Sequence, residues 1–168
     1  MREFFPQGVN IDILKKRSTN KIMKSLVPYI NFEKDTEKIF EFYANVLRGE
    51  ITSRLYYRDL PSDEMPADTK LTEEDRAKIL HMELSVNGQA VLLGSDILEV
   101  FGSTVNPGNN ISITIEADDK VEADRLFAEL SEGGEVSMPM DTVFWDAYFG
   151  SLKDRYGITW LVNCSNNS

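Results

Sequence analysis

Residues 79–86 (ILHMELSV) constrain the fold more than any other stretch of the chain. Apolar side chains alternate there strictly with His81, Glu83 and Ser85. This period of two predicts a strand with one face packed on a core and the other face polar. The Asn87-Gly88 pair that follows is a strong hairpin signal, so residues 89–94 are predicted to return as the neighbouring strand.

The segment before this hairpin is predicted to add a strand, a helix and a second strand. Alternating apolar residues predict the first strand over 26–32, with Pro28 near its start because proline donates no ladder hydrogen bond. Asp35 is predicted to cap a helix whose apolar residues recur at three- and four-residue intervals, up to a stop at Gly49. With a strand over 50–57, the order is that of a βαβββ module.

The connection over residues 58–78 is polar and acidic and contains two prolines. A helical turn is predicted within residues 68–78. Two interpretations stay open for the whole segment, because long polar insertions serve either as solvated connections or as flaps over a pocket.

The second half of the chain repeats this order of elements. A strand is predicted over 111–115, and Asp119 with Glu122 three residues later resembles a capping box at the start of a helix. Gly133-Gly134 marks the end of that helix. Three further strands are predicted over 135–144 and in the two arms of a hairpin that turns at Gly157.

Together these patterns predict an α+β fold made of two βαβββ modules. The modules span residues 24–94 and 109–164, with a linker over 95–108, and they form one domain over 23–164. Residues 1–22 break from this pattern and are basic where the rest of the chain is acidic. We interpret them as an appended leader or tag, with a basic partner-binding tail as the alternative.

Charge and cysteine usage exclude several classes of protein. The net charge of −10 argues against a nucleic-acid partner, because phosphate binding needs a basic face. No apolar run approaches the roughly 20 residues of a membrane-spanning helix. The single cysteine, Cys164, allows no internal disulfide, which suits a cytoplasmic protein.

The stretch W-D-A-Y-F-G…D-R-Y-G-I-T-W over residues 145–160 resembles the closing hairpin of PhnB-like proteins of the glyoxalase/vicinal-oxygen-chelate superfamily. The family pattern is W-G-x-x-x-G-x-x-x-D-P-x-G-H-x-W; here Arg155 replaces the proline and Ile158 the histidine. Residues 28–32, 40–50 and 81–84 resemble the family's opening strand, helix and third strand. The resemblance spans about residues 24–164.

This resemblance implies paired modules with U-shaped sheets that close a cleft, and a homodimer. Metal enzymes of the superfamily carry four His, Glu or Gln ligands in that cleft. The matching positions here fall near Tyr29, Glu83, Asn110 and Leu161, which offer at most one good ligand, and a shift of one residue adds His81. We therefore expect no resident metal or other cofactor, with a divalent metal on an unusual ligand set as the alternative.

The candidate site is the side of the sheets opposite the helices. We expect it to bind a small organic ligand through six residues: Tyr29, His81, Glu83, Ser112, Tyr148 and Trp160. His81 and Glu83 are also the candidates for an acid–base pair, although a polar pair bonded to its neighbours explains them equally simply.

Three functions follow from this reading. The first is a small-molecule-binding homodimer without a complete metal tetrad, whose enzymatic activity is left open. The second is a divalent-metal-dependent lyase, isomerase or dioxygenase of the glyoxalase type. The third is a resistance protein that sequesters a drug or toxin. Relatives have been labelled methyltransferases, but the sequence has no Gly-rich nucleotide loop.

Overall fold

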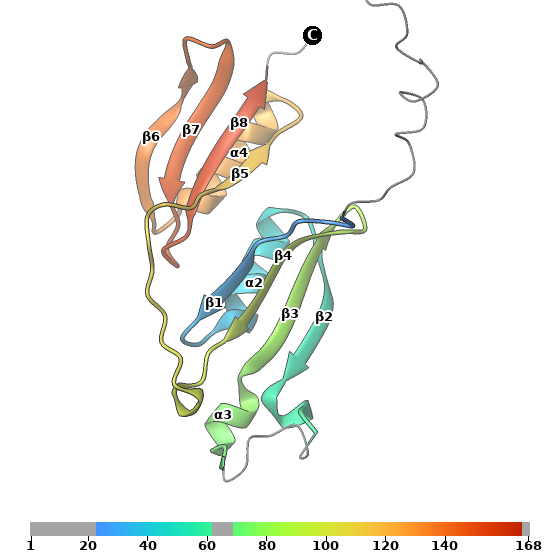
Figure 1. Cartoon of the computed structure of the whole chain (residues 1–168). Helices are drawn as coiled ribbons and strands as arrows, with labels where there is room; N and C mark the ends of the chain where they lie inside the picture. Colours follow the sequence, from blue (N-terminus) through green and yellow to red (C-terminus); the bar gives the residue numbers. More distant parts are fainter. Residues whose placement is uncertain (1–22, 62–68, 166–168) are drawn as a thin grey trace, which may run out of the picture.

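The computed structural model describes residues 23–61 and 69–165 (Figure 1). In chain order the elements are β1 (Tyr29–Phe32), α2 (Thr36–Val46), β2 (Glu50–Tyr56), η1 (Tyr57–Asp59), α3 (Glu73–Ala77), β3 (Ile79–Val86), β4 (Gln89–Asp96), η2 (Glu99–Phe101), β5 (Ile113–Glu116), α4 (Lys120–Ser131), β6 (Glu135–Thr142), β7 (Ala147–Lys153) and β8 (Thr159–Ser165). The predicted extension over 1–22 lies outside the described residues.

The described strands form two four-stranded mixed sheets of the same topology. Their orders are β1-β4-β3-β2 and β5-β8-β7-β6. In each sheet the first strand pairs parallel with the last strand of its module, and the other pairs are antiparallel. Two βαβββ modules of an α+β fold are therefore confirmed, and each helix lies behind its own sheet in Figure 1.

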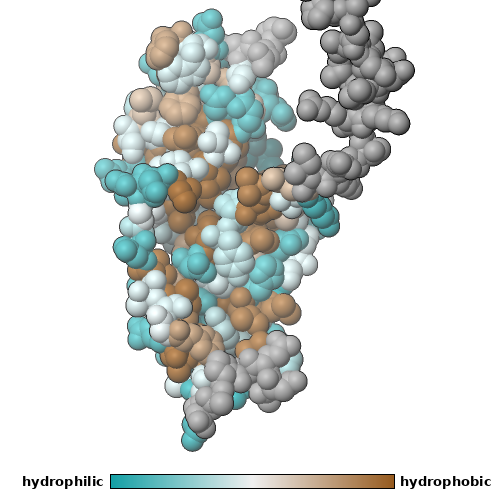
Figure 2. Space-filling view, viewed as in Figure 1, coloured by the Kyte–Doolittle hydropathy of each residue, from teal (hydrophilic) through white to brown (hydrophobic). Residues whose placement is uncertain are grey.

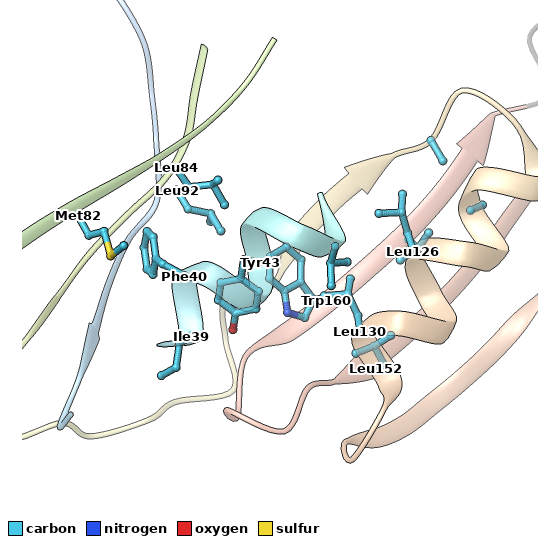
Figure 3. Close-up of a cluster of buried hydrophobic side chains, with 14 of the residues drawn as sticks. Ile39, Phe40, Tyr43, Met82, Leu84, Leu92, Leu126, Leu130, Leu152 and Trp160 are labelled. Carbon is cyan, nitrogen blue, oxygen red and sulfur yellow. The ribbon is translucent and has the colours of Figure 1, made fainter. Parts of the chain in front are cut away.

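One continuous core joins the two modules. In the first module Met82, Leu84 and Leu92 are fully buried and lie with Phe40 of α2 (Figure 3). In the second, α4 contributes a matching apolar stripe. The members of that stripe that are buried are Ala123, Leu126 and Leu130. Burial of these side chains is the main source of stability, at about 1.5–3 kcal/mol for each large one.

Asp154 joins the modules inside this core. Its side chain is only 3% exposed and accepts hydrogen bonds from Tyr43 Oη at 2.7 Å and Trp160 Nε1 at 2.8 Å. It also accepts the backbone N–H groups of Tyr156 and Ile158, which closes the turn between β7 and β8. Since Tyr43 lies on α2, one carboxylate ties the first helix to the last hairpin.

Asp35 occupies the N-cap position of α2, as predicted, but it does not supply the capping hydrogen bond. Its φ is 68°, in the left-handed region. The cap comes instead from Asp96, which accepts hydrogen bonds from the backbone N–H and hydroxyl of Thr36 and from the backbone N–H of Ile79. A buried carboxylate from β4 thus replaces the local cap.

The end of α2 differs from the prediction. The residue in the left-handed conformation is Arg48, with φ of 50°, and not Gly49. A Cβ on Gly49 would lie 2.6 Å from the carbonyl oxygen of Ser85, so this glycine is needed for the close approach of β3. The predicted turn at Asn87-Gly88 is confirmed, with φ of 52° and 73°.

Candidate functional site

The first sheet has one face that no described element covers. Met82 and Leu84 point from β3 toward α2, whereas His81, Glu83 and Ser85 point to the opposite side, as the alternation predicts. We call this opposite side the open face. Its residues are Tyr29, Asn31, Thr52, Leu55, His81, Glu83, Ser85, Leu93 and Ser95. In Figure 1 both sheets turn the side opposite their helix toward the viewer, which for the first sheet is the open face. Figure 2 shows apolar and polar residues interspersed on this side of the molecule.

The strand register places Tyr29 and Glu83 in one row across the open face. Tyr29 of β1 pairs with Leu93 of β4, and Leu93 pairs with Glu83 of β3. Paired residues point to the same side of a sheet. The Tyr29 ring also lies 5.9 Å from the His81 ring, at an interplanar angle of 34°. Three of the predicted site residues therefore gather on one surface.

Glu83 is held in place by two hydroxyl groups. Thr52 Oγ1 donates to Glu83 Oε1 at 2.6 Å, Ser85 Oγ lies 3.4 Å from the same oxygen, and the two hydroxyls are 3.2 Å apart. Sequence reasoning missed Thr52, because EITSRLY has no clean alternation and a register shift separates Ile51 from Ser53. Both donors engage Oε1, and the carboxylate is thereby oriented on the face.

Asn31 and Ser95 form a second polar pair on the open face. Ser95 Oγ donates to Asn31 Oδ1 at 3.1 Å. Ser95 is 7% exposed, so the pair is partly withdrawn from solvent. The face therefore offers oriented oxygen acceptors beside an aromatic pair, which suits hydrogen bonding to an organic molecule.

The second sheet carries a polar cluster of its own on the side opposite α4. Glu116 of β5 accepts hydrogen bonds from Asn163 Nδ2 at 2.6 Å and from the backbone N–H of Ser165 at 2.9 Å. The Ser165 hydroxyl, and then the Asn163 amide, lower the pKa of Glu116. No local sequence signal pointed to this cluster, since its members lie on strands that are far apart in the chain.

Two of the predicted ligand-binding residues lie away from the open face. Trp160 is 1% exposed and packs edge-to-face on Tyr43 at a ring distance of 5.4 Å, so it belongs to the core. Tyr148 points to the helix side of its sheet and donates to Asp124 of α4 at 2.7 Å. Ser112 is exposed on the segment that leads into β5, in the other module from Tyr29 and Glu83.

The donor set of a single chain does not fit the metal tetrad that the superfamily resemblance implies. Within residues 23–61 and 69–165, no three His, Cys, Asp or Glu side chains lie close enough together to hold an ion. His81 and Glu83 share a strand face, and Glu83 already accepts from Thr52. Two donors fall short of the three or four of a tetrahedral or octahedral site.

Two hollows lie near α3, away from the open face. One has a volume of about 420 Å³ and is lined by residues that include Asp75, Lys78 and Val100. The other, of about 400 Å³, lies between α3 and the start of α2. Both are lined largely by charged side chains and are open to solvent. Neither includes Tyr29, His81 or Glu83, and we retain the open face as the candidate site.

A family model described as 3-demethylubiquinone-9 3-methyltransferase matches residues 24–163. Protein PA1353 from Pseudomonas aeruginosa is 36% identical, with 85% of this chain and 98% of that chain covered and a TM-score of 0.71. The PhnB protein from Bacillus cereus is 20% identical, with 84% and 100% covered and a TM-score of 0.64.

A more distant structure shows the wider fold. A glyoxalase/bleomycin resistance protein/dioxygenase family enzyme from Burkholderia phytofirmans PsJN is 13% identical to this chain. The alignment covers 81% of this chain and 95% of that one, with a TM-score of 0.52. At this identity the likeness concerns the fold alone.

No helix in the part of the chain that the structure describes is long and apolar enough to cross a membrane.

Proposed function

This chain belongs to the PhnB-like 3-demethylubiquinone-9 3-methyltransferase family and has the glyoxalase fold, and from that membership we propose that it binds a small organic molecule on the open face. The observation that supports this most is the grouping of Tyr29, His81 and Glu83. An aromatic pair beside an oriented carboxylate is the composition of small-ligand sites. The methyltransferase activity in the family's name is not part of the proposal, since the sequence lacks a Gly-rich nucleotide loop.

A second copy of the chain completes this site. In one chain the open face is a surface, with Tyr29 47% and Leu55 46% exposed. Apolar surface of this kind is stabilised when a partner covers it, and two sheets that face each other enclose a cleft. We expect light scattering to give twice the 19.1 kDa mass of the chain. A monomer mass at micromolar concentration would contradict the dimer.

The ligand proposal is tested by a thermal-shift screen of small organic compounds. A compound that raises the melting temperature of the parent protein by several degrees should lose this effect in Tyr29→Ala and His81→Ala variants. Tyr148→Phe is the matched control, because its hydroxyl bonds to Asp124 on the other side of the second sheet. Hits that stabilise all variants equally would show that the ligand binds elsewhere.

A metal-dependent lyase, isomerase or dioxygenase is the second candidate, and His81 and Glu83 on one strand face are the observation in its favour. We expect no stoichiometric metal in protein prepared from metal-replete medium, because the donors are too few. Elemental analysis of the parent and of a His81→Ala variant tests this expectation. One equivalent of metal in the parent that disappears in the variant would favour the enzyme.

Sequestration of a drug or toxin is the same binding activity put to a different use, and it differs from catalysis only in leaving its ligand unchanged. Recovery of an intact ligand after prolonged incubation would support it.

We place the protein in the cytoplasm, since Cys164 is a buried free thiol and a reducing compartment keeps thiols in this state.

A further inference from the structure

We propose that the ligand of the open face is an organic cation, in which an amine is carried on a flat ring. This inference rests on the proposed function and specifies the chemical class of its ligand. Three observations support it: the charge of Glu83, the row of paired residues that joins Glu83 to Tyr29, and the position of Arg54 on the helix side of the sheet.

The carboxylate of Glu83 has no cationic partner on its own sheet. Arg54 is the only lysine or arginine in the described strands β1 to β4. It points to the helix side, where its guanidinium pairs with Glu37 at 3.1 Å and Glu41 at 3.2 Å. Glu83 is instead held by neutral hydroxyls, which orient the carboxylate without neutralising it. A cationic ligand would give this carboxylate the partner that the described strands of its sheet lack, and a charge-assisted bond to an oriented carboxylate is a strong one.

The row of residues across the sheet sets the length of the ligand. Tyr29 and Glu83 flank Leu93 on neighbouring strands, which places their backbones about 10 Å apart at the usual strand spacing. Leu93 forms an apolar floor between them. A ring that lies on Leu93 against Tyr29 and His81 brings an attached amine to Glu83, and the exposed Tyr29 face also attracts a cation. A carboxylate ligand would meet Glu83 as a like charge.

Three indoles that share one ring test this inference by isothermal titration at neutral pH and physiological salt. Tryptamine carries a cation, 3-methylindole is neutral, and indole-3-acetate carries an anion. We expect tryptamine to bind at least tenfold more tightly than the other two. Glu83→Gln should weaken tryptamine about tenfold and leave 3-methylindole unchanged. Glu116→Gln, which alters the oriented carboxylate of the second sheet, is the matched control and should change neither.

Thr52→Val is a second variant for the case in which Glu83→Gln does not fold. It releases the carboxylate without removing the charge and should weaken tryptamine severalfold. The inference is overturned if indole-3-acetate or 3-methylindole binds as tightly as tryptamine, if the Glu83 and Thr52 variants bind tryptamine like the parent, or if none of the three binds. If 3-methylindole binds tightly and Tyr29→Ala abolishes that binding, the ligand need not be a cation. The inference would then be wrong, but binding of a small organic molecule on the open face would still be supported.

Discussion

At the scale of single residues, Asp154 has the largest number of partners in the core. Both of its oxygens accept two hydrogen bonds, Oδ2 from Tyr43 and Trp160 and Oδ1 from two backbone N–H groups. Buried carboxylates are costly unless every lone pair is engaged in this way. The four donors together compensate for the burial of the Asp154 carboxylate, and each donor in turn depends on a carboxylate oxygen as its acceptor.

We predict that Asp154→Asn lowers the free energy of unfolding by about 2–4 kcal/mol, since either orientation of the amide turns its NH2 group toward two donors. Tyr43→Phe removes one donor and leaves the carboxylate with three, so it should cost only about 1 kcal/mol. Urea unfolding at neutral pH measures both. An Asp154→Asn variant as stable as Tyr43→Phe would contradict this view of the site.

Tyr43 also gives the protein a dependence on alkaline pH. Burial, and then the charge of Asp154, raise the pKa of Tyr43 above its usual range. In the unfolded chain a tyrosine releases its proton near pH 10, so above that pH the unfolded state binds fewer protons than the native state. Stability contributed by this group is present below about pH 10 and declines as the pH rises, by up to about 1.4 kcal/mol per pH unit.

Urea unfolding at several pH values between about 9 and 11 checks this. The parent should lose stability more steeply than Tyr43→Phe, because the variant lacks the buried phenol. Parallel pH profiles for the two proteins would show that Tyr43 does not carry the effect.

At the scale of elements, how much the sequence predicts depends on whether a strand has one apolar side or two. Residues 79–86 alternate strictly, and the side chains of β3 point as predicted. In TWLVNCS, by contrast, Leu161 lies on one side of β8 and Trp160 and Val162 on the other, so the local pattern leaves the orientation undecided. Trp160 is turned inward by Asp154 and Tyr43, and Tyr43 is distant in sequence. The predicted site residues on β1 and β3 accordingly share one face of the first sheet, whereas those on β7 and β8 point to the helix side of the second sheet.

Packing between α2 and the first sheet depends on a glycine in β4. A Cβ at Gly94 would lie 2.7 Å from Phe40 Cε2 and Cζ and 2.8 Å from the carbonyl oxygen of Ile30. Gly94→Ala should therefore destabilise the protein by about 1–3 kcal/mol, since Phe40 is fully buried and cannot move away.

Gly108→Ala is the matched control for this prediction. Its added Cβ would meet only the side-chain oxygen of Asn110, at 3.1 Å, and that side chain can rotate. The control should change the melting temperature very little. Equal effects of the two substitutions in a thermal melt would contradict the packing argument.

At the scale of the whole molecule, the two modules share one core. Tyr43 of the first module contacts Trp160 of the second, and Arg125 of α4 donates to the backbone carbonyl of Val46 at 2.9 Å. The buried apolar cluster runs through both sheets without a break. Separate unfolding of either module would expose part of this core, which favours a single cooperative transition.

We therefore predict that a Trp145→Phe variant, in which fluorescence reports on Trp160 alone, unfolds in urea with one midpoint by fluorescence and by far-UV circular dichroism. Trp145 is half-exposed and lies outside the shared core, so its replacement should leave stability unchanged. A fluorescence change that precedes the loss of circular dichroism would mean that the second module opens first.

The hydrogen bond between Tyr43 and Asp154 also has a consequence for biosynthesis, because its partners are 111 residues apart in the chain. At elongation rates of about 5–20 residues per second, the ribosome makes Asp154 on the order of ten seconds after Tyr43. By then the strands of the first module have all been translated. Until the closing hairpin emerges, the Tyr43 hydroxyl lacks its acceptor and the flank of α2 that packs on Trp160 stays open to chaperones.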